Sequence, residues 1–255
     1  VVLQMWAGDE PAALRLARLL ADIEPARRDD MQLVLARRFD LPLSAESWDT
    51  LVHCGAKFPV SHIQVARRGT GHPAGCNALW SGAMAHLART WRHGHLRRSA
   101  LFFIEADGCP LRSDWASVLI AEHQASLAAG RRVTGALTRF PMPHFNGSLI
   151  AEASVWWDRA SLHVTPPEQA WDLFHAAALL QEGRATSLIK NVYNARAATP
   201  EMLDALSPET AWVCNAKDAS LIDWAERALV QPARTAPRWR PEPTPRPGPG
   251  MPYTP

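Results

Sequence analysis

Residues 100–115 read ALFFIEADGCPLRSDW, and this stretch decides the fold. The unbroken apolar run 100–104 predicts a buried strand, and a glycine and a proline then force a turn. Glu105 and Asp107 therefore stand at the carboxyl end of that strand. Two acids at positions i and i+2 project to the same side of an extended chain, where their hard oxygens suit Mg²⁺ or Mn²⁺. The alternative is a strand end with two solvated acids.

Apolar strand-like runs alternate with helical patterns along the chain. Strands are predicted over residues 1–6, 30–38, 100–107, 131–137 and 145–154, and helices over 8–25, 72–92, 113–130, 168–182 and 219–229. Strands separated by helices of this length predict an α/β, Rossmann-like domain: a mostly parallel central sheet with helices on both faces. Ligands of such folds bind at the carboxyl ends of the strands.

Composition separates a folded body from a tail. The chain has 255 residues, of which 47% are hydrophobic and 20% charged, as in ordinary globular proteins. Residues 231–255 contain nine prolines, so we expect them to be a disordered tail behind one domain over residues 1–230. The tail has four arginines and one glutamate, a net charge of +3, and the formal charge of +2 for the chain leaves −1 for the body. That body is not a general polyanion binder.

The cysteines and the apolar stretches predict a cytoplasmic protein. The four cysteines form no CxxC pair, which favours reduced thiols over a disulfide scaffold or a structural zinc site. The longest apolar stretches fall far short of the roughly 18 residues that a membrane span needs. No secretory leader is visible at the start of the sequence. Nothing in the sequence indicates an oligomeric state.

The motif Glu105-Ala106-Asp107 resembles the acid-x-Asp signature of the GT-A glycosyltransferase family. In that family the motif ends a buried strand and binds a metal ion together with the diphosphate of a nucleotide sugar. The resemblance implies Mn²⁺ or Mg²⁺ as cofactor and a nucleotide sugar, a UDP-sugar above all, as donor. Asp107 is the better metal-ligand candidate. Glu105 departs from the commoner Asp and is expected to act through water or on the ribose.

The resemblance extends in order along residues 1–225 and implies further nucleotide contacts. The first strand leads into a nucleotide-facing loop that contains Asp9. The second ends at ARRFD, where Arg37, its neighbour Arg38 and Asp40 meet the base or the ribose. Asn77, in GHPAGCNALWSGAMAH, lies beside the nucleotide. The alternative for Asn77 is a helix N-terminal cap or turn residue.

Two later segments supply sugar contacts and a base. His144-Phe145-Asn146-Gly147 is predicted to be a compact polar turn in which His144 and Asn146 bind sugar hydroxyls. A hairpin or bulge turn is the alternative. Asp172 starts a predicted helix, where inverting members of the fold place the carboxylate that deprotonates the acceptor hydroxyl. The alternative for Asp172 is an acid favoured by the helix dipole.

The end of the domain departs from the family. Many metal-dependent relatives carry a late histidine that completes the metal shell, yet the last histidine here is His175. Cys214, Asn215 or Asp218 would have to take its place, or water would. Lys217 is a candidate phosphate contact, or else part of a solvated charged turn.

The resemblance therefore implies a metal-dependent hexosyltransferase. Asp172 as the base implies inversion at the sugar, and a retaining mechanism is the alternative. Compact relatives occur in phage and bacterial gene sets beside DNA-base hypermodification enzymes, so a 5-hydroxymethylpyrimidine in phage DNA is one acceptor, reached in a bacterial or phage-infected cytoplasm. The basic tail and the RRFD, ARRG and WRHGHLRR clusters favour it, and the near-neutral body counts against it. A glycan, lipid-linked or small-molecule acceptor is the alternative. Two other classes of function are open: a nucleotidyltransferase, whose first loop WAGDEP matches poorly, and a non-catalytic nucleotide-binding relative. The sequence has no P-loop, GxGxxG or GxSxG motif, which argues against a P-loop nucleotidase, a dinucleotide oxidoreductase and an α/β-hydrolase.

Overall fold

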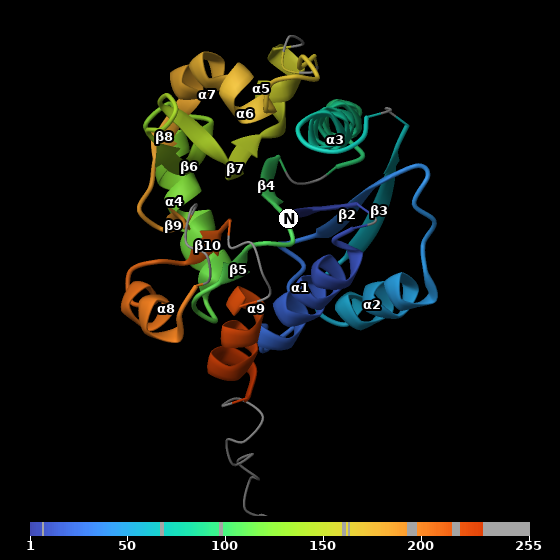
Figure 1. Cartoon of the computed structure of the whole chain (residues 1–255), viewed down its shortest axis with the longest axis vertical. Coiled ribbons are helices and arrows are strands. Elements are labelled where there is room, and N and C mark those ends of the chain that lie inside the picture. The colour runs from blue at the N-terminus through green and yellow to red at the C-terminus, as the bar shows by residue number, and fades with distance from the viewer. Residues whose placement is uncertain are drawn as a thin grey trace, which may run out of the picture.

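A seven-stranded sheet forms the centre of the protein (Figure 1). The computed structural model describes residues 1–6, 8–66, 69–96, 99–159, 162, 164–192, 198–215 and 220–231. The strands of the sheet are β1 (Val2–Met5), β2 (Leu33–Arg38), β3 (Val60–Val65), β4 (Ala100–Ile104), β6 (Val133–Thr138), β7 (His144–Glu152) and β8 (Gly183–Ala185). Their order is β3-β2-β1-β4-β7-β6-β8, so the strand that ends at Glu105 lies in the middle.

Most neighbouring strands of this sheet run in the same direction. β3, β2, β1 and β4 are parallel to one another, and β8 is parallel to β6. Only β7 runs against its two neighbours, β4 and β6. The predicted α/β class with a mostly parallel sheet is confirmed. The carboxyl ends of β1, β2 and β4 therefore meet at one edge, where ligands of such sheets bind.

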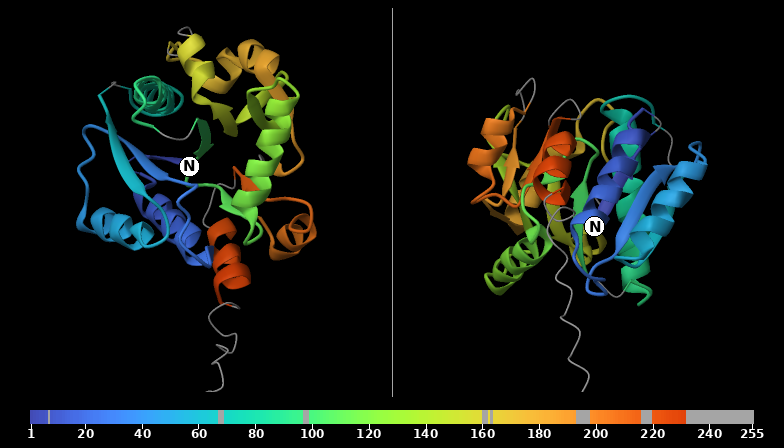
Figure 2. Two further views of the ribbon diagram at one scale, coloured as in Figure 1. Left: turned by 180° about the vertical axis from the view of Figure 1, so that it is seen from behind. Right: turned by 90° about the horizontal axis from the view of Figure 1, so that it is seen from below.

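Helices cover both faces of the sheet (Figure 1). One face packs against α1 (Glu10–Ile23), α2 (Ala45–Gly55), α4 (Trp115–Ala128), α8 (Pro200–Leu206), α9 (Ser220–Ala225) and the π-helix η2 (Glu226–Val230). The other face packs against α3 (Ala74–Arg92), α5 (Ala153–Asp158), α6 (Trp171–Phe174) and α7 (Ala176–Glu182). Near its C-terminal end the described chain returns to its beginning, because α9 and η2 both contact α1 (Figure 2).

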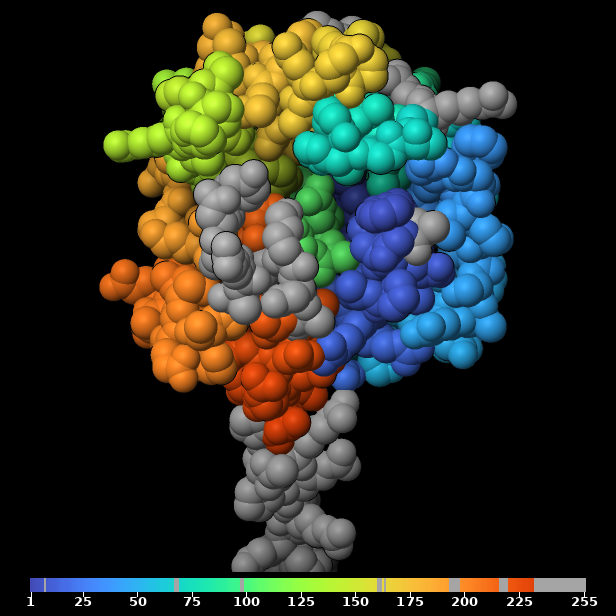
Figure 3. All heavy atoms as spheres, in the orientation of Figure 1, coloured from blue at the N-terminus to red at the C-terminus, as the bar shows by residue number. Residues whose placement is uncertain are grey.

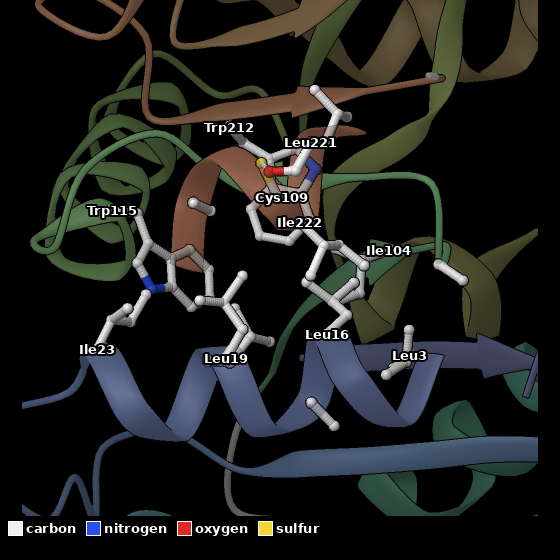
Figure 4. Packing of buried hydrophobic residues seen from close by; sticks show 14 of the residues in the cluster. Leu3, Leu16, Leu19, Ile23, Ile104, Cys109, Trp115, Trp212, Leu221 and Ile222 are labelled. Carbon is white, nitrogen blue, oxygen red and sulfur yellow. Dashed lines mark hydrogen bonds between the residues drawn. The ribbon is translucent and has the colours of Figure 1, made fainter. Parts of the chain in front are cut away.

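The core on the α1 face joins residues from distant parts of the chain. Leu16, Leu19 and Ile23 of α1 point toward Trp115 of α4 and Ile222 of α9 (Figure 4). All five side chains are buried. Burying large apolar side chains contributes about 1.5–3 kcal/mol each, so this contact is a main source of the cohesion between the two ends of the fold.

A small second sheet fixes the segment that follows the acids. It has the order β5-β10-β9, with β5 at Cys109–Pro110, β9 at Ile189–Asn191 and β10 at Trp212–Cys214. β10 pairs with β5, and the Trp212 ring lies 5.4 Å from the Trp115 ring and 5.2 Å from that of Phe102. A Cβ on Gly108 would lie 3.0 Å from Trp212 Nε1, so a larger residue would fit only if the Trp212 ring shifted by a few tenths of an ångström. The turn after β4 is thus held at both ends.

Several predicted elements were wrong in place or type. The predicted helix over 168–182 is two short helices, α6 and α7, interrupted at His175. His144–Gly147 is not a turn but the start of β7. The pairing of β7 with β6 is irregular next to this segment, as in the bulge that was the alternative prediction. α2, β3 and α8 were not predicted at all. Their apolar positions are few and their faces half exposed, which leaves a weak periodic signal.

Among the described residues, no helix combines the length and the apolar character that crossing a bilayer requires.

Gly82 of α3 packs directly on β3, and replacing it is expected to destabilise the fold. A methyl group there would lie 2.1 Å from Cγ1 of the buried Val65. We expect Gly82→Ala to lower the free energy of unfolding by about 1–3 kcal/mol through overpacking. Gly55→Ala, in α2, is the matched control, because the nearest atom to its methyl group would be Val60 Cγ2 at 3.9 Å. Urea unfolding measures both, and equal effects would contradict the prediction.

Candidate functional site

A pocket of about 670 Å³ opens at the carboxyl ends of β1, β2 and β4. In Figure 3 this region of the surface is where α1 (blue), α3 (teal) and the segment after β4 (green) meet. Strand ends, the first turns of α1 and α3, and the turn after β4 supply its lining: Gln4, Trp6, Gly8, Asp9, Ala12, Arg38, Gly71, His72, Gly75, Cys76, Leu79, Glu105, Ala106 and Asp107. The pocket is at the edge where a ligand site was expected.

Glu105 and Asp107 both line this pocket, although the backbone between them is not extended. The Gly108 N–H donates to the Glu105 carbonyl (3.2 Å), which closes a turn over the motif. Ala106, the residue between the acids, is buried in the α1-face core and also lines the pocket. The two acids therefore share the pocket through a turn and not through the alternation of an extended strand.

Asp9 faces the same acids from the start of α1. Its Oδ1 accepts a hydrogen bond from the Trp6 N–H (2.8 Å). The pKa of Asp9 is raised to about 6, chiefly by burial and in smaller part by the nearby charge of Asp107, while the hydrogen bond from Trp6 acts in the opposite sense. Two carboxylates held this close in a pocket favour a proton or a cation between them.

The raised pKa of Asp9 makes stability depend on pH. A carboxyl group whose pKa is higher in the folded state binds more protons there, so the ionised group lowers stability as pH rises through about 6. Asp9→Asn removes this penalty and keeps an oxygen for Trp6. We expect it to raise the melting temperature of the ligand-free protein at pH about 7.5 and to have little effect near pH 4.5. Asp49→Asn, on the exposed side of α2, is the control. Equal shifts at both pH values would refute the prediction.

Trp6 lies at the mouth of the pocket, 53% exposed. Its ring covers Gly8, since a Cβ on that glycine would lie 2.1 Å from Trp6 Cη2. A large aromatic side chain that stays exposed beside a pocket offers a flat face on which a ring can stack.

His144 and Asp172 form a second polar group close to this pocket. His144 Nδ1–H donates to the Met142 carbonyl (2.7 Å), and its Nε2 lies 3.9 Å from Asp172 Oδ2. Burial raises the pKa of Asp172, and the neighbouring His144 and His72 lower it in part. Because His72 lines the pocket, Asp172 lies within electrostatic reach of it.

β7 connects the two groups. A Cβ on Gly147 would lie 3.6 Å from the Trp171 ring and 3.9 Å from Glu105 Oε1. Glu105 and the helix that carries Asp172 therefore both lie close to Gly147 of β7. The sequence segments of His144, Glu105 and Asp172 are brought together as expected.

Comparisons with known proteins identify the fold. No protein-family profile matches the chain, and no curated protein matches it. Among solved structures, an active-site mutant of LgtC has a TM-score of 0.53 at 10% identity and covers 89% of this chain and 95% of its own. The galactosyltransferase LgtC with donor and acceptor sugar analogues has a TM-score of 0.51 at 10% identity, with the same coverage.

Two longer glycosyltransferases match as well. GlyE of Streptococcus pneumoniae has a TM-score of 0.53 at 11% identity over 86% of this chain, and the bifunctional WbbM one of 0.49 at 12% identity over 90%. The chain spans only about half the length of these two, 49% of WbbM and 55% of GlyE.

This chain has a GT-A-like fold. Identities of this size show the shared fold and no more, and the solved structures that share it here are glycosyltransferases. In the GT-A-like fold of this chain, the acid turn after β4 lies centrally at the open edge of the sheet.

Arg37 and Asp40, expected at the base or the ribose, do not line the pocket. Successive residues of a strand point to opposite faces, and Arg37 points to the α1 face, where it is 4% exposed and burial lowers its pKa. Arg38 is the residue that lines the pocket. Its Nε donates to Asp40 Oδ1 (2.9 Å) and its Nη1 to the Gly69 carbonyl, so Asp40 orients Arg38 and this ion pair lowers the pKa of Asp40.

Asn77 is buried in the first turns of α3 and its amide is fully used. Its Nδ2 donates to the carbonyls of Pro166 (3.1 Å) and Gln169 (2.7 Å), and its Oδ1 accepts from the Trp171 N–H (3.0 Å). It is neither a helix cap nor a pocket residue. It fastens the segment before Asp172 to the helix that forms one wall of the pocket.

Asn146, Cys214 and Asn215 do not line the pocket, although their segments pack beside the acid turn. Asn146 Oδ1 accepts from Cys214 Sγ (3.2 Å), whose buried thiol also bonds to the Lys190 carbonyl. Asn215 donates to Asn191 Oδ1 (3.0 Å). These bonds hold β7 to the small sheet. Lys217 and Asp218 lie outside the described residues.

The pocket acids fit a divalent cation only in part. In the portion of the chain that the structure describes, no group of three or more His, Cys, Asp or Glu side chains could hold a metal ion. Glu105 and Asp107 are nevertheless hard oxygen donors on one pocket, and Asp9 nearby has the raised pKa of a carboxyl group that lacks a compensating charge. Mg²⁺ and Mn²⁺ are often held by one or two carboxylates plus phosphate oxygens of a substrate. The residues fit a cation that arrives with a diphosphate.

Sequence analysis did not single out several residues of the pocket, among them Gln4, Trp6, His72 and Cys76. Trp6 lies in the segment WAGDEP, and His72 and Cys76 lie in GHPAGCNALWSGAMAH, but neither segment indicated these positions. Gln4 carried a signal, since a single polar residue interrupts the apolar run VVLQM. The others are brought to the pocket only by the packing of α3 over β1.

Proposed function

We propose that the protein is a metal-dependent glycosyltransferase that moves a sugar from a nucleoside diphosphate donor to an acceptor hydroxyl. One observation carries the proposal: Glu105, Asp107 and Asp9 converge on one pocket at the strand ends of a GT-A-like fold. A nucleotide diphosphate with its metal ion is the ligand that such a cluster of negative charge accepts.

Asp107 and Glu105 would hold the metal ion, which supplies positive charge to the leaving diphosphate. Asp9 is the third carboxylate of the pocket and lies within electrostatic range of Asp107. Trp6 offers its face to the nucleobase at the mouth, and Arg38, oriented by Asp40, offers a fixed cation beside it. A UDP-sugar is the donor that we propose.

Asp172 is the proposed general base. The acceptor oxygen attacks the anomeric carbon, its proton passes to the Asp172 carboxylate, and the bond from that carbon to the diphosphate oxygen breaks with its electron pair on the phosphate. His144 is proposed to position Asp172 while its own Nδ1–H stays on the Met142 carbonyl. Direct attack by the acceptor inverts the anomeric centre.

The acceptor that we favour is a glycan or small molecule. One of the basic clusters that favour DNA, WRHGHLRR, starts at the C-terminal end of α3, whereas the pocket lies at its N-terminal end, about 28 Å away for 19 residues. Arg38 of the RRFD cluster lines the pocket but is paired with Asp40, and Arg67, Arg68 and the tail, residues 232–255, lie outside the described residues. Near the base, by contrast, Phe140 (78% exposed), Met142 and Phe174 are open apolar side chains, and such exposed apolar groups mark binding surfaces.

A hydrolysis and transfer screen tests the proposal. Nucleotide sugars are incubated with the protein, with Mn²⁺ and with chelator, and release of nucleoside diphosphate is measured. Metal-dependent release from one sugar nucleotide supports a glycosyltransferase. Release of pyrophosphate from a nucleoside triphosphate would instead indicate a nucleotidyltransferase. Metal-dependent binding without any release would indicate a non-catalytic nucleotide-binding protein.

A further inference from the structure

The closed end of the pocket holds a buried amide. Gln4 of β1 lines the pocket but is only 6% exposed, in contrast to Trp6 at the mouth. Its Nε2 has no hydrogen-bond partner within the described residues. A buried donor without a partner lowers the stability of the protein, because it has lost its hydrogen bond to water and has formed no other. A ligand that supplies an acceptor restores that hydrogen bond.

Glu105 lies beside Gln4. Parallel strands β1 and β4 pair Leu3 with Ile104, and Gln4 and Glu105 are the next residues on each strand. Both line the pocket, on the sheet face that packs against α3. The amide donates hydrogen bonds and the ionised carboxylate accepts them. Side by side they form a donor–acceptor pair.

We propose that Gln4 is a specificity-determining residue that binds, together with Glu105, a pair of neighbouring hydroxyl groups of the nucleotide sugar; this rests on the proposed function. A hydroxyl group both donates and accepts, so a vicinal diol matches the pair. A phosphate without its cation does not, because it only accepts hydrogen bonds and is repelled by Glu105. The diphosphate is expected at Glu105 and Asp107, and the groups bonded directly to it are the ribose and the transferred sugar. Either carries the required diol.

The experiment compares Gln4→Leu with the wild type by calorimetry in Mn²⁺. The probes are the nucleoside diphosphate that binds the wild type most tightly, its 2′-deoxy and 3′-deoxy analogues, and the corresponding nucleotide sugar. Gln124→Leu, at an exposed position of α4, is the control. Leucine fills a similar volume and removes the unpaired amide, so the ligand-free variant is expected to melt no lower than the wild type. Gln4→Met is a second variant of the same kind.

We expect Gln4→Leu to bind the diol-bearing ligand about 3- to 10-fold more weakly than the wild type does, which is the effect of one lost hydrogen bond. The wild type is expected to prefer the diol-bearing ligand over its deoxy analogue by a similar factor, and the variant is expected to lose that preference. A loss of affinity that is already seen with the nucleoside diphosphate, which has no transferred sugar, assigns the diol to the ribose. A loss that is seen only with the nucleotide sugar assigns the diol to the transferred sugar. Unchanged affinity and unchanged preference in Gln4→Leu overturn the inference and leave the proposed function standing. If the wild type binds no nucleoside diphosphate in Mn²⁺, both are overturned.

Discussion

Asp172→Asn is expected to bind the donor as the wild type does and to lose transfer by about 10²–10⁴-fold. The carboxamide keeps the shape of the side chain, and its oxygen can still accept from the Leu173 N–H as Asp172 Oδ1 does at 3.0 Å. What disappears is the group that takes the acceptor proton. Single-turnover transfer and calorimetric donor affinity are measured on the same preparation. Asp158→Asn, at an exposed carboxylate of α5 that pairs with Arg132, is the control.

The pH profile adds a readout that loss of structure would not produce. A general base works in its ionised form, so transfer falls as pH drops through the pKa of Asp172, which burial holds above the ordinary carboxyl range. His144 lowers that pKa in part. His144→Gln is therefore expected to move the acid limb of the profile to higher pH. A wild-type rate in Asp172→Asn would reduce that residue to an acid at the start of a helix.

Asp107→Ala is expected to abolish the stabilisation that a nucleoside diphosphate gives in the presence of divalent metal. At a ligand concentration of 100 times Kd, the wild type gains about 2.7 kcal/mol. The variant should gain almost none, because Asp107 is the proposed metal ligand and a diphosphate without its cation meets the negative charges of Glu105 and Asp9. Thermal melts with Mn²⁺, with chelator and with each ligand alone measure this.

Two comparisons make the result specific to the metal. Glu105→Gln keeps a neutral oxygen at its position and is expected to lose less stabilisation than Asp107→Ala. Chelator is expected to bring the wild type to the level of Asp107→Ala. Shifts of equal size with and without chelator, or metal-dependent binding retained in Asp107→Ala, would contradict the assignment.

The sequence was informative where one local signal determines the structure. The run ALFFI followed by Glu105 and Asp107 predicted both the central strand and the acids at its end, because burial and turn chemistry are local there. Arg38, and not Arg37, lines the pocket. A shift of one residue along a strand moves a side chain to the other face of the sheet, and the sequence RR does not show which of the two arginines faces the pocket.

Other features depended on tertiary contacts that no local pattern carries. Asn77 reads as a cap or a ligand contact, and only the packing of a segment some 90 residues away uses its amide. The polar cluster at His144 reads as a turn, yet pairing with β6 draws it into a strand. Gln4 becomes a pocket residue because α3 covers the end of β1.

The amide of Asn77 also makes the two halves of the site one mechanical unit. Its three hydrogen bonds tie the first turns of α3, which wall the donor pocket, to Pro166, Gln169 and Trp171, the residue before Asp172. On the proposed function, a donor that displaces the start of α3 would pull on the segment that carries Asp172. Thermodynamic linkage then requires an acceptor bound at Asp172 to change the donor affinity by the same factor as the donor changes the acceptor affinity.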